Sequence, residues 1–167
     1  MPQAKYTPQQ VANYFIEQAR RQGVELTKIK LMKLVYISYA WYLYFTDQDL
    51  FDEKIEAWEY GPVIPAIRDK INENIEGNII QDYIDGEDTK IPKEDFQTDE
   101  FLRITVNCIW DLYKNTTPFK LVGILHEEGS AWKAVYEKNK NNPINTEKNK
   151  KLIKKRAEIA INKIINN

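Results

Sequence analysis

Cysteine and histidine are almost absent from this sequence, which has one residue of each in 167. A single cysteine excludes an intramolecular disulfide framework, and one cysteine with one histidine cannot assemble a usual zinc site. The chain also lacks the GxxxxGK(S/T) and GxGxxG phosphate-binding loops, the GxSxG nucleophile motif, and the CxxC and HExxH motifs. We therefore expect no metal site and no cofactor, and we expect that the protein is not an enzyme.

No uncharged apolar stretch is long enough to cross a membrane. The longest, Leu34–Phe45, has 12 residues, whereas a membrane-spanning helix needs about 17 to 25. The first ten residues contain neither a basic leader nor an apolar signal region. With 43% hydrophobic and 29% charged residues, the composition is that of a globular protein. We expect one soluble, cytoplasmic domain over residues 1–167.

Charge is unevenly distributed, although the net charge is only −1. Asp47–Glu100 holds 17 acidic and 5 basic residues, which gives −12, whereas Lys133–Asn167 holds 10 basic and 3 acidic residues, which gives +7. Such surfaces suit contact with another protein, but they are also typical of solvated faces that attract each other within one fold.

Helix caps and apolar spacing predict a mainly α fold. Thr7–Pro8 and Gly23 predict a first helix over Pro8–Gln22, with one apolar stripe facing a core. Thr27 predicts the start of a second, central helix that reaches about Phe45. Its expected buried side has a spacing of three and four: Ile29, Met32, Tyr36, Tyr39 and Leu43.

After a long loop or small β excursion at Glu76–Gln97, more helices are expected. Thr98 would cap a helix whose apolar side includes Cys108, which places Cys108 in the core. Three further helices are predicted from their capping residues, at Thr117–Pro118, Gly129–Ser130 and Thr146, the last being lysine-rich and covering about Glu147–Ile165. The prediction is a compact single-domain bundle of about six to seven helices with a short extended excursion in the middle.

The segment EAWEYGPVIPAI, Glu56–Ile67, concentrates aromatic residues, one glycine and two prolines. Gly61 can adopt backbone angles that are closed to residues with a Cβ, and Pro62 fixes its own φ and restricts the residue before it. We expect an extended stretch, then a rigid corner, then a third helix with Pro62 in its first turn. Trp58 and Tyr60 are expected to brace this corner.

The sole histidine, His126, precedes two glutamates, but neighbours in sequence on a helix point in different directions, which makes it a weak candidate for a general base. A structural role is favoured. We expect His126 to lie close to Trp132 or to the Gly61 corner and to form a hydrogen bond, with the indole N–H of Trp132 also bonded.

A DNA-binding regulator is an alternative. The first helix, the turn at Gln22–Leu26 and a second helix that opens with Thr27, Lys28, Lys30 and Lys33 loosely resemble a helix-turn-helix. The terminal KNKKLIKKR, Lys148–Arg156, is a second candidate contact with nucleic acid. The second helix is almost wholly apolar after Lys33, however, which favours a core element over a recognition helix.

Three segments carry a more specific pattern: LTKIKLMKLVYISYAWYL (Leu26–Leu43), LFDEKIEAWEYGPVIPAI (Leu50–Ile67) and LHEEGSAW (Leu125–Trp132). In this order and at comparable separations they resemble the SocA-like domain, also called Panacea, an antitoxin domain of bacteria and their phages. The most specific part is the W-x-Y-G-P-V run at Trp58–Val63, and the resemblance covers most of residues 6–140. Met32 stands where that family often has glutamine.

The resemblance implies a mostly helical, non-enzymatic domain that neutralises a toxin by direct binding. Its partner would be a cognate toxin encoded by an adjacent gene and, in one branch, a Clp-type protease that receives the toxin; nucleic acid is disfavoured and no membrane is involved. The family-motif residues, expected to be structural, are Lys30, Leu34, Trp58, Tyr60, Gly61, Pro62, Val63, His126 and Trp132. The candidate partner-binding residues lie in the terminal helix: Lys150, Lys151, Lys154 and Lys155.

Overall fold

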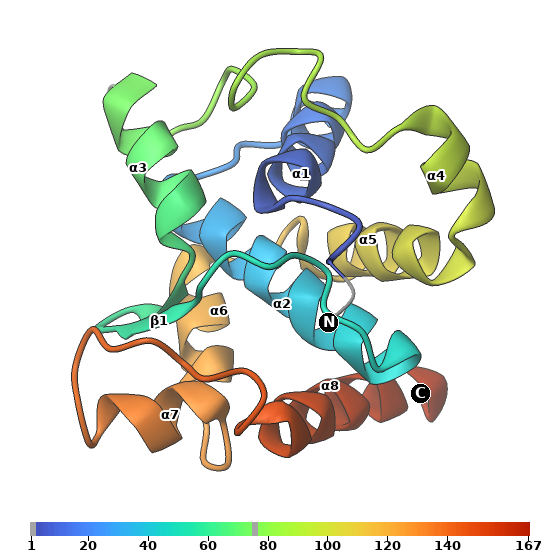
Figure 1. The fold of residues 1–167 in the computed structure, drawn as a ribbon. Helices are drawn as coiled ribbons and strands as arrows, with labels where there is room; N and C mark the ends of the chain where they lie inside the picture. Colours follow the sequence, from blue (N-terminus) through green and yellow to red (C-terminus); the bar gives the residue numbers. More distant parts are fainter. Residues whose placement is uncertain (1–2, 75–76) are drawn as a thin grey trace.

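A computed structural model describes residues 3–74 and 77–167 (Figure 1). Over these residues the chain forms eight helices and one two-stranded antiparallel sheet, so the expectation of a mainly α fold with a short β excursion is confirmed. The elements in chain order are α1 (Pro8–Gln22), α2 (Lys28–Thr46), β1 (Glu56–Trp58), β2 (Gly61–Val63), α3 (Pro65–Asn74), α4 (Lys93–Thr98), α5 (Glu100–Tyr113), α6 (Pro118–Leu125), α7 (Ala131–Tyr136) and α8 (Lys150–Ile165). Within the described ranges, no helix combines the length and apolar character needed to cross a bilayer.

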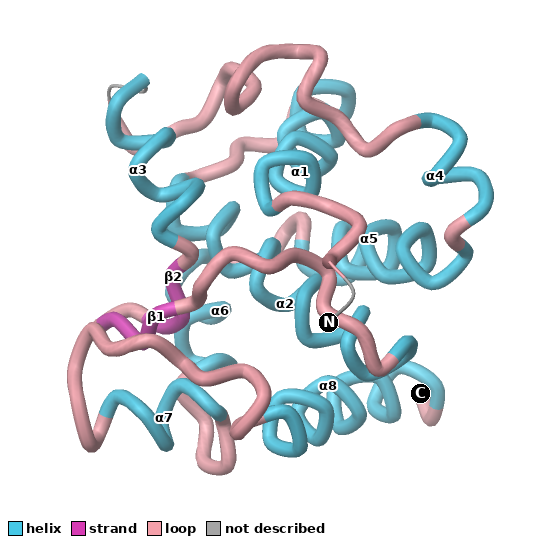
Figure 2. The backbone as a smooth tube through the Cα atoms, in the orientation of Figure 1, coloured by secondary structure: helices cyan, strands magenta, loops and turns pink. Residues whose placement is uncertain are grey.

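Helix α2 runs through the middle of the molecule, with α1 and α5 on one side and α8 on the other (Figure 1 and Figure 2). Every residue from Lys30 to Leu43 is buried. A helix that is apolar all round has no face suited to water and must be covered on every side. Ile29, which we expected on the buried side, is exposed, because it lies in the first turn before this covered stretch begins.

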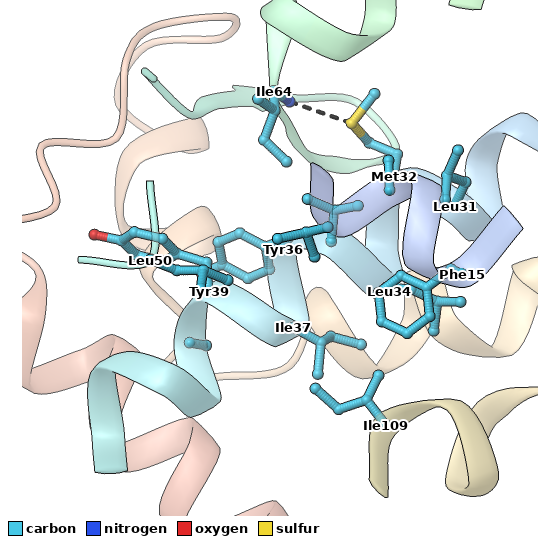
Figure 3. Close-up of a cluster of buried hydrophobic side chains, with 14 of the residues drawn as sticks. Phe15, Leu31, Met32, Leu34, Tyr36, Ile37, Tyr39, Leu50, Ile64 and Ile109 are labelled. Atoms are coloured by element: carbon cyan, nitrogen blue, oxygen red, sulfur yellow. Dashed lines mark hydrogen bonds between the residues drawn. The ribbon is translucent and has the colours of Figure 1, made fainter. Parts of the chain in front are cut away.

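The core forms where neighbouring helices meet α2. In Figure 3, Phe15 of α1 and Ile109 of α5 point toward Leu34 and Ile37 of α2. All four belong to one buried cluster, and each such side chain contributes about 1.5 to 3 kcal/mol when it is removed from water. Helix α8 closes the opposite side of α2 with its own apolar stripe, Ile153, Ala157 and Ile161.

The start of α5 differs from the expectation. Thr98 ends the short helix α4, which the sequence did not predict, and the cap of α5 is Asp99, whose carboxylate accepts the backbone N–H of Leu102 at 3.0 Å. The same carboxylate accepts the phenol hydroxyls of Tyr6 at 2.7 Å and Tyr42 at 3.0 Å. Because these bonds to Tyr6 and Tyr42 hold the carboxylate in place, Asp99 caps α5 instead of Thr98.

The predicted first residues of two further helices, α3 and the terminal helix α8, were also wrong. Pro62 does not begin a helix but lies in β2, and α3 begins at Pro65, because the strand pairing with β1 holds Pro62 in an extended conformation. The terminal helix begins after Asn149 and not after Thr146. The intervening turn is held by Asn145, whose side chain accepts the N–H of Lys148 at 2.9 Å.

The prediction that Cys108 is buried in the core is wrong. The side of α5 that faces α2 carries Leu102, Thr105, Val106, Ile109, Trp110 and Tyr113. Cys108 lies on the opposite side and is exposed, as are Phe101, Ile104 and Leu112. Because α5 is apolar on two sides, the helical period identified the helix but not the side that would be covered.

The long connection from Gly77 to Pro92 is attached to the core by Asn13, which is fully buried in α1. Its amide nitrogen donates to the carbonyls of Ile84 at 2.9 Å and Thr89 at 2.5 Å, and its amide oxygen accepts the N–H of Ile84 at 2.8 Å. A side chain with both a donor and an acceptor can therefore satisfy three backbone groups of a loop that has no ladder of its own.

Replacement of Asn13 by leucine should lower the free energy of unfolding by about 2 to 4 kcal/mol, because backbone groups of the loop would stay buried without partners. Urea denaturation measures this change, and hydrogen exchange should increase at Ile84. Asn162→Leu, at an exposed position of α8, is the matched control and should stay within about 1 kcal/mol of the parent. An unchanged midpoint for Asn13→Leu would contradict the assignment.

Candidate functional site

The corner predicted around Gly61 is a tight hairpin. Trp58 pairs with Gly61 and Ala57 with Pro62, so the turn consists of two residues, Glu59 and Tyr60. Gly61 has φ of +108°, a conformation that residues with a Cβ rarely adopt. Trp58 is half-buried, but Tyr60 is 60% exposed, so the expected bracing role of Tyr60 is wrong.

Lys33 of α2 lies directly beneath this hairpin and is only 2% exposed. Its Nζ donates to the carbonyl oxygen of Pro62 at 3.0 Å. A methyl group placed on Gly61 would lie 3.0 Å from that nitrogen. Glycine is therefore required at this position for two reasons: its backbone angles, and the space that Nζ of Lys33 occupies.

His126 caps the end of α6 and lies close to Trp132 of α7, as predicted. The two rings are stacked, with centroids 3.7 Å apart and planes that differ by 2°. The indole N–H of Trp132 donates to the carbonyl of Trp58 at 2.6 Å, and Tyr136 stacks on the outer side of Trp132 at 4.7 Å. The expected hydrogen bond to the imidazole is absent at Nε2, which is buried without a partner.

Two basic nitrogens face the space left by the missing side chain of Gly61. A methyl group placed on Gly61 would lie 3.7 Å from Nε2 of His126, in addition to its contact with Nζ of Lys33. Burial lowers the pKa of Lys33 to about 7. Burial also lowers the pKa of His126, and the positive charge of Lys33 lowers it further. In the folded protein, the neutral forms of both side chains are therefore favoured more than they are in water.

The remaining motif residues extend this joint into α2. Leu34 is fully buried, and Lys30 is buried with its ammonium group donating to the carbonyl of Lys114. Met32, at the position where glutamine was expected, accepts the backbone N–H of Ile64 through its sulfur at 3.3 Å (Figure 3). Arg68 of α3 covers the Trp58 ring at 4.4 Å. The motif thus joins α2, the hairpin, α3 and the α6–α7 segment.

The structure does not bring the terminal lysines to this joint. Lys150 and Lys154 reach Asp47 at the end of α2, at 3.2 and 2.8 Å, and hydrogen bonds from them hold the pKa of that carboxyl below its usual range. Lys155 pairs with Glu158 of its own helix at 2.9 Å. Lys151 is exposed. These four lysines therefore lie near the opposite end of α2 from the hairpin.

Sequence reasoning placed Lys33 within the family-like segment and weighed it as a contact with DNA, but did not predict its place in the joint. The available signal was its position, because a lysine directly before twelve uncharged residues of a helix, Leu34–Phe45, is close to core positions. Within the described residues, no three His, Cys, Asp or Glu side chains converge as ligands for a metal ion. Chemically, the site offers two basic nitrogens that are shielded from solvent, Nζ of Lys33 and Nε2 of His126.

A family model described as Antitoxin SocA-like, Panacea domain, matches residues 31–133, which is more than half of the chain. The chain belongs to this family. The matched region includes the hairpin, Lys33, His126 and Trp132, so the joint lies inside the Panacea domain, whereas α1 and α8 lie outside the match. Comparison with curated proteins gave no match, and comparison with solved structures gave none either.

Gly61→Ala should lower the free energy of unfolding by about 2 to 3 kcal/mol, because the substitution strains the backbone and displaces the ammonium group of Lys33. Gly23 is the matched control. It also has positive φ, +64°, but a methyl group there would meet no atom within 4 Å, so Gly23→Ala should cost only about 1 kcal/mol. Equal losses in guanidinium denaturation would show that the close approach to Lys33 contributes nothing.

Lys33→Met should change how stability depends on pH. Between pH 7 and 10.5, the unfolded state binds the proton of Lys33 and the folded state does not, so the free energy of unfolding of the parent rises with pH, at most by about 1.4 kcal/mol per unit. The variant should lose this part of the slope between pH 7.5 and 9.5. Lys151→Met, at an exposed position, should retain it, and a slope unchanged in Lys33→Met would refute the assignment.

Proposed function

We propose that this protein is an antitoxin that neutralises a cognate toxin by direct protein–protein binding and without catalysis. The observation that carries the proposal is the match to the antitoxin Panacea model over a region that contains the hairpin, Lys33, His126 and Trp132. Membership of this family supports an antitoxin role in general. The mode of neutralisation is our inference from the arrangement of the described residues.

The basic groups of the joint have structural partners, which supports a binding role over an enzymatic one. Lys33 is bonded to the hairpin, and His126 is packed face to face on Trp132. A general base must reach the proton that it removes, but Nε2 of His126 and the side chain of Lys33 are shielded from solvent. We therefore propose that the joint positions surrounding elements and does not act on a substrate.

The burial of two lysines argues against the alternative of a DNA-binding regulator. Lys30 and Lys33, which would face phosphates in a helix-turn-helix, are 4% and 2% exposed, and both donate to backbone carbonyls. Phosphate binding requires cations that reach the surface. The first turn of α2 is therefore better suited to support the core than to enter a groove of DNA.

Co-expression tests the proposal. The product of the reading frame next to this gene should stop growth of a bacterial host when it is expressed alone, and growth should resume when this chain is co-expressed. A binding mechanism also requires that the two purified proteins form a complex that elutes together. Toxicity that this chain does not relieve, or relief without any complex, would overturn the proposal of direct binding.

Delivery of the toxin to a Clp-type protease is a separate mode of the same proposal. It would lower the amount of epitope-tagged toxin in co-expressing cells, and the loss would disappear in a host without the protease. Neutralisation by sequestration alone would leave the amount of toxin unchanged in both hosts. Pulse-chase measurement of the tagged toxin distinguishes the two modes.

The terminal lysines are candidates for partner contact, and we expect their replacement to affect binding more than folding. Changing Lys150, Lys151, Lys154 and Lys155 to glutamine removes the ion pairs to Asp47 and Glu158, which lie at the surface, where solvent screens such pairs and they contribute little to stability. Toxin binding should weaken and should depend less on salt. Calorimetric titration at two salt concentrations measures both effects. If the variant and the parent had equal affinity and equal salt dependence, the terminal lysines would not form the recognition surface. The acidic Asp47–Glu100 region would then be the next candidate.

A further inference from the structure

An apolar groove of about 480 Å³ lies between α2, the C-terminal ends of α5 and α6, the start of α7, and α8. Its floor comes from α2, including Tyr36 and Trp41, and its walls include Leu112 of α5, Ile124 of α6 and Ile164 of α8. The volume lies within the range of about 300 to 1,000 Å³ that is usual for sites that enclose an apolar group. Leu112 and Ile164 are both exposed, so the groove is open at the surface.

The groove continues into an exposed apolar stripe on α5. Phe101, Ile104, Cys108 and Leu112 are exposed and follow one another at spacings of three and four residues, so they lie on one side of the helix. From Phe101 to Leu112 the helix rises by about 16 Å. A surface of this length exceeds what a small molecule in the groove would cover, but it suits the apolar side of a helix from another protein.

The rim of the groove is basic. Arg156 and Lys163 of α8 both line it. Arg156 pairs with Glu127, which also lines the groove, whereas the structure gives Lys163 no carboxylate partner among the described residues. An acidic residue beside an apolar anchor of the occupant would therefore meet a favourable charge at this edge.

Charge also argues against a second copy of this chain as the occupant. A symmetric dimer uses the same surface twice, so two copies joined through the groove would bring two α8 rims together. Each α8 carries six basic residues and one acidic residue between Lys150 and Ile165, and the like charges would repel. A foreign helix with apolar anchors and flanking acidic residues has no such conflict.

We infer that this groove and the α5 stripe form the docking site for an amphipathic, acidic helix of the toxin. The inference rests on the proposed antitoxin function and adds the chemistry of the partner segment. The groove residues of α2, α5, α6 and α7 belong to the region that matches the Panacea model, whereas α8 lies outside it. Helix α8 therefore supplies the part of the site that selects one toxin helix over another.

The test uses the product of the neighbouring reading frame as the probe. Cys108 is the sole cysteine and lies in the stripe, so the unmodified chain can be labelled there with a maleimide at pH 8. The probe should slow this labelling at least about fivefold when it saturates the site. Ala160→Trp, which fills the groove, should weaken probe binding at least about tenfold, whereas Ala66→Trp, at a half-buried position of α3, which does not line the groove, should not.

A charge variant provides a second measurement if Ala160→Trp does not fold, as judged by circular dichroism. Lys163→Glu should weaken binding about three- to tenfold and change its salt dependence, and Lys138→Glu, exposed outside the groove, is the matched control. If the probe binds the parent but both groove variants bind equally well and Cys108 stays reactive, the docking site is overturned and the antitoxin function stands. If the probe does not bind the parent, both proposals are overturned. A change from dimer to monomer in Ala160→Trp, seen by light scattering, would assign the groove to a second copy and overturn the inference.

Discussion

Burial of α2 on all sides is the constraint on which the rest of the structure depends. Fourteen consecutive residues, Lys30 to Leu43, lie out of water, so the other elements must form a closed sleeve around a helix that has no solvent face. Helix α1 and α5 cover one side and α8 covers another, while the hairpin and α6 close the region near Lys33. Any element that left this sleeve would expose large apolar side chains.

Buried polar side chains in this core allow only one packing of the surrounding segments, because each needs a hydrogen-bond partner. A buried amine or amide without a partner costs about 1 to 3 kcal/mol or more, so Lys33 and Asn13 accept only a packing that offers carbonyls at the right positions. Lys33 finds Pro62, and Asn13 finds Ile84 and Thr89. The hairpin and the long loop, which have few backbone bonds of their own, are thereby fixed against helices distant in sequence.

Local signals predicted much of the helical framework, because capping is a short-range effect. Thr7–Pro8, Thr117–Pro118 and Ser130 each cap a helix as expected. The errors occur where distant partners decide. Asp99 replaces Thr98 as a cap because Tyr6 and Tyr42 bond to it.

Similarly, Cys108 is exposed because α2 meets the other apolar side of α5. At the candidate site, the proximity of His126 to Trp132 was predicted, but the role of Lys33 depends on a contact with Gly61 across 28 residues, which local spacing does not contain. The groove was equally inaccessible, since residues of five helices, distant in sequence, line it. The groove also borders the hairpin joint, because Leu125 and Ala131 line it and are the sequence neighbours of His126 and Trp132. The α6–α7 segment that anchors the hairpin therefore also forms one edge of the open surface.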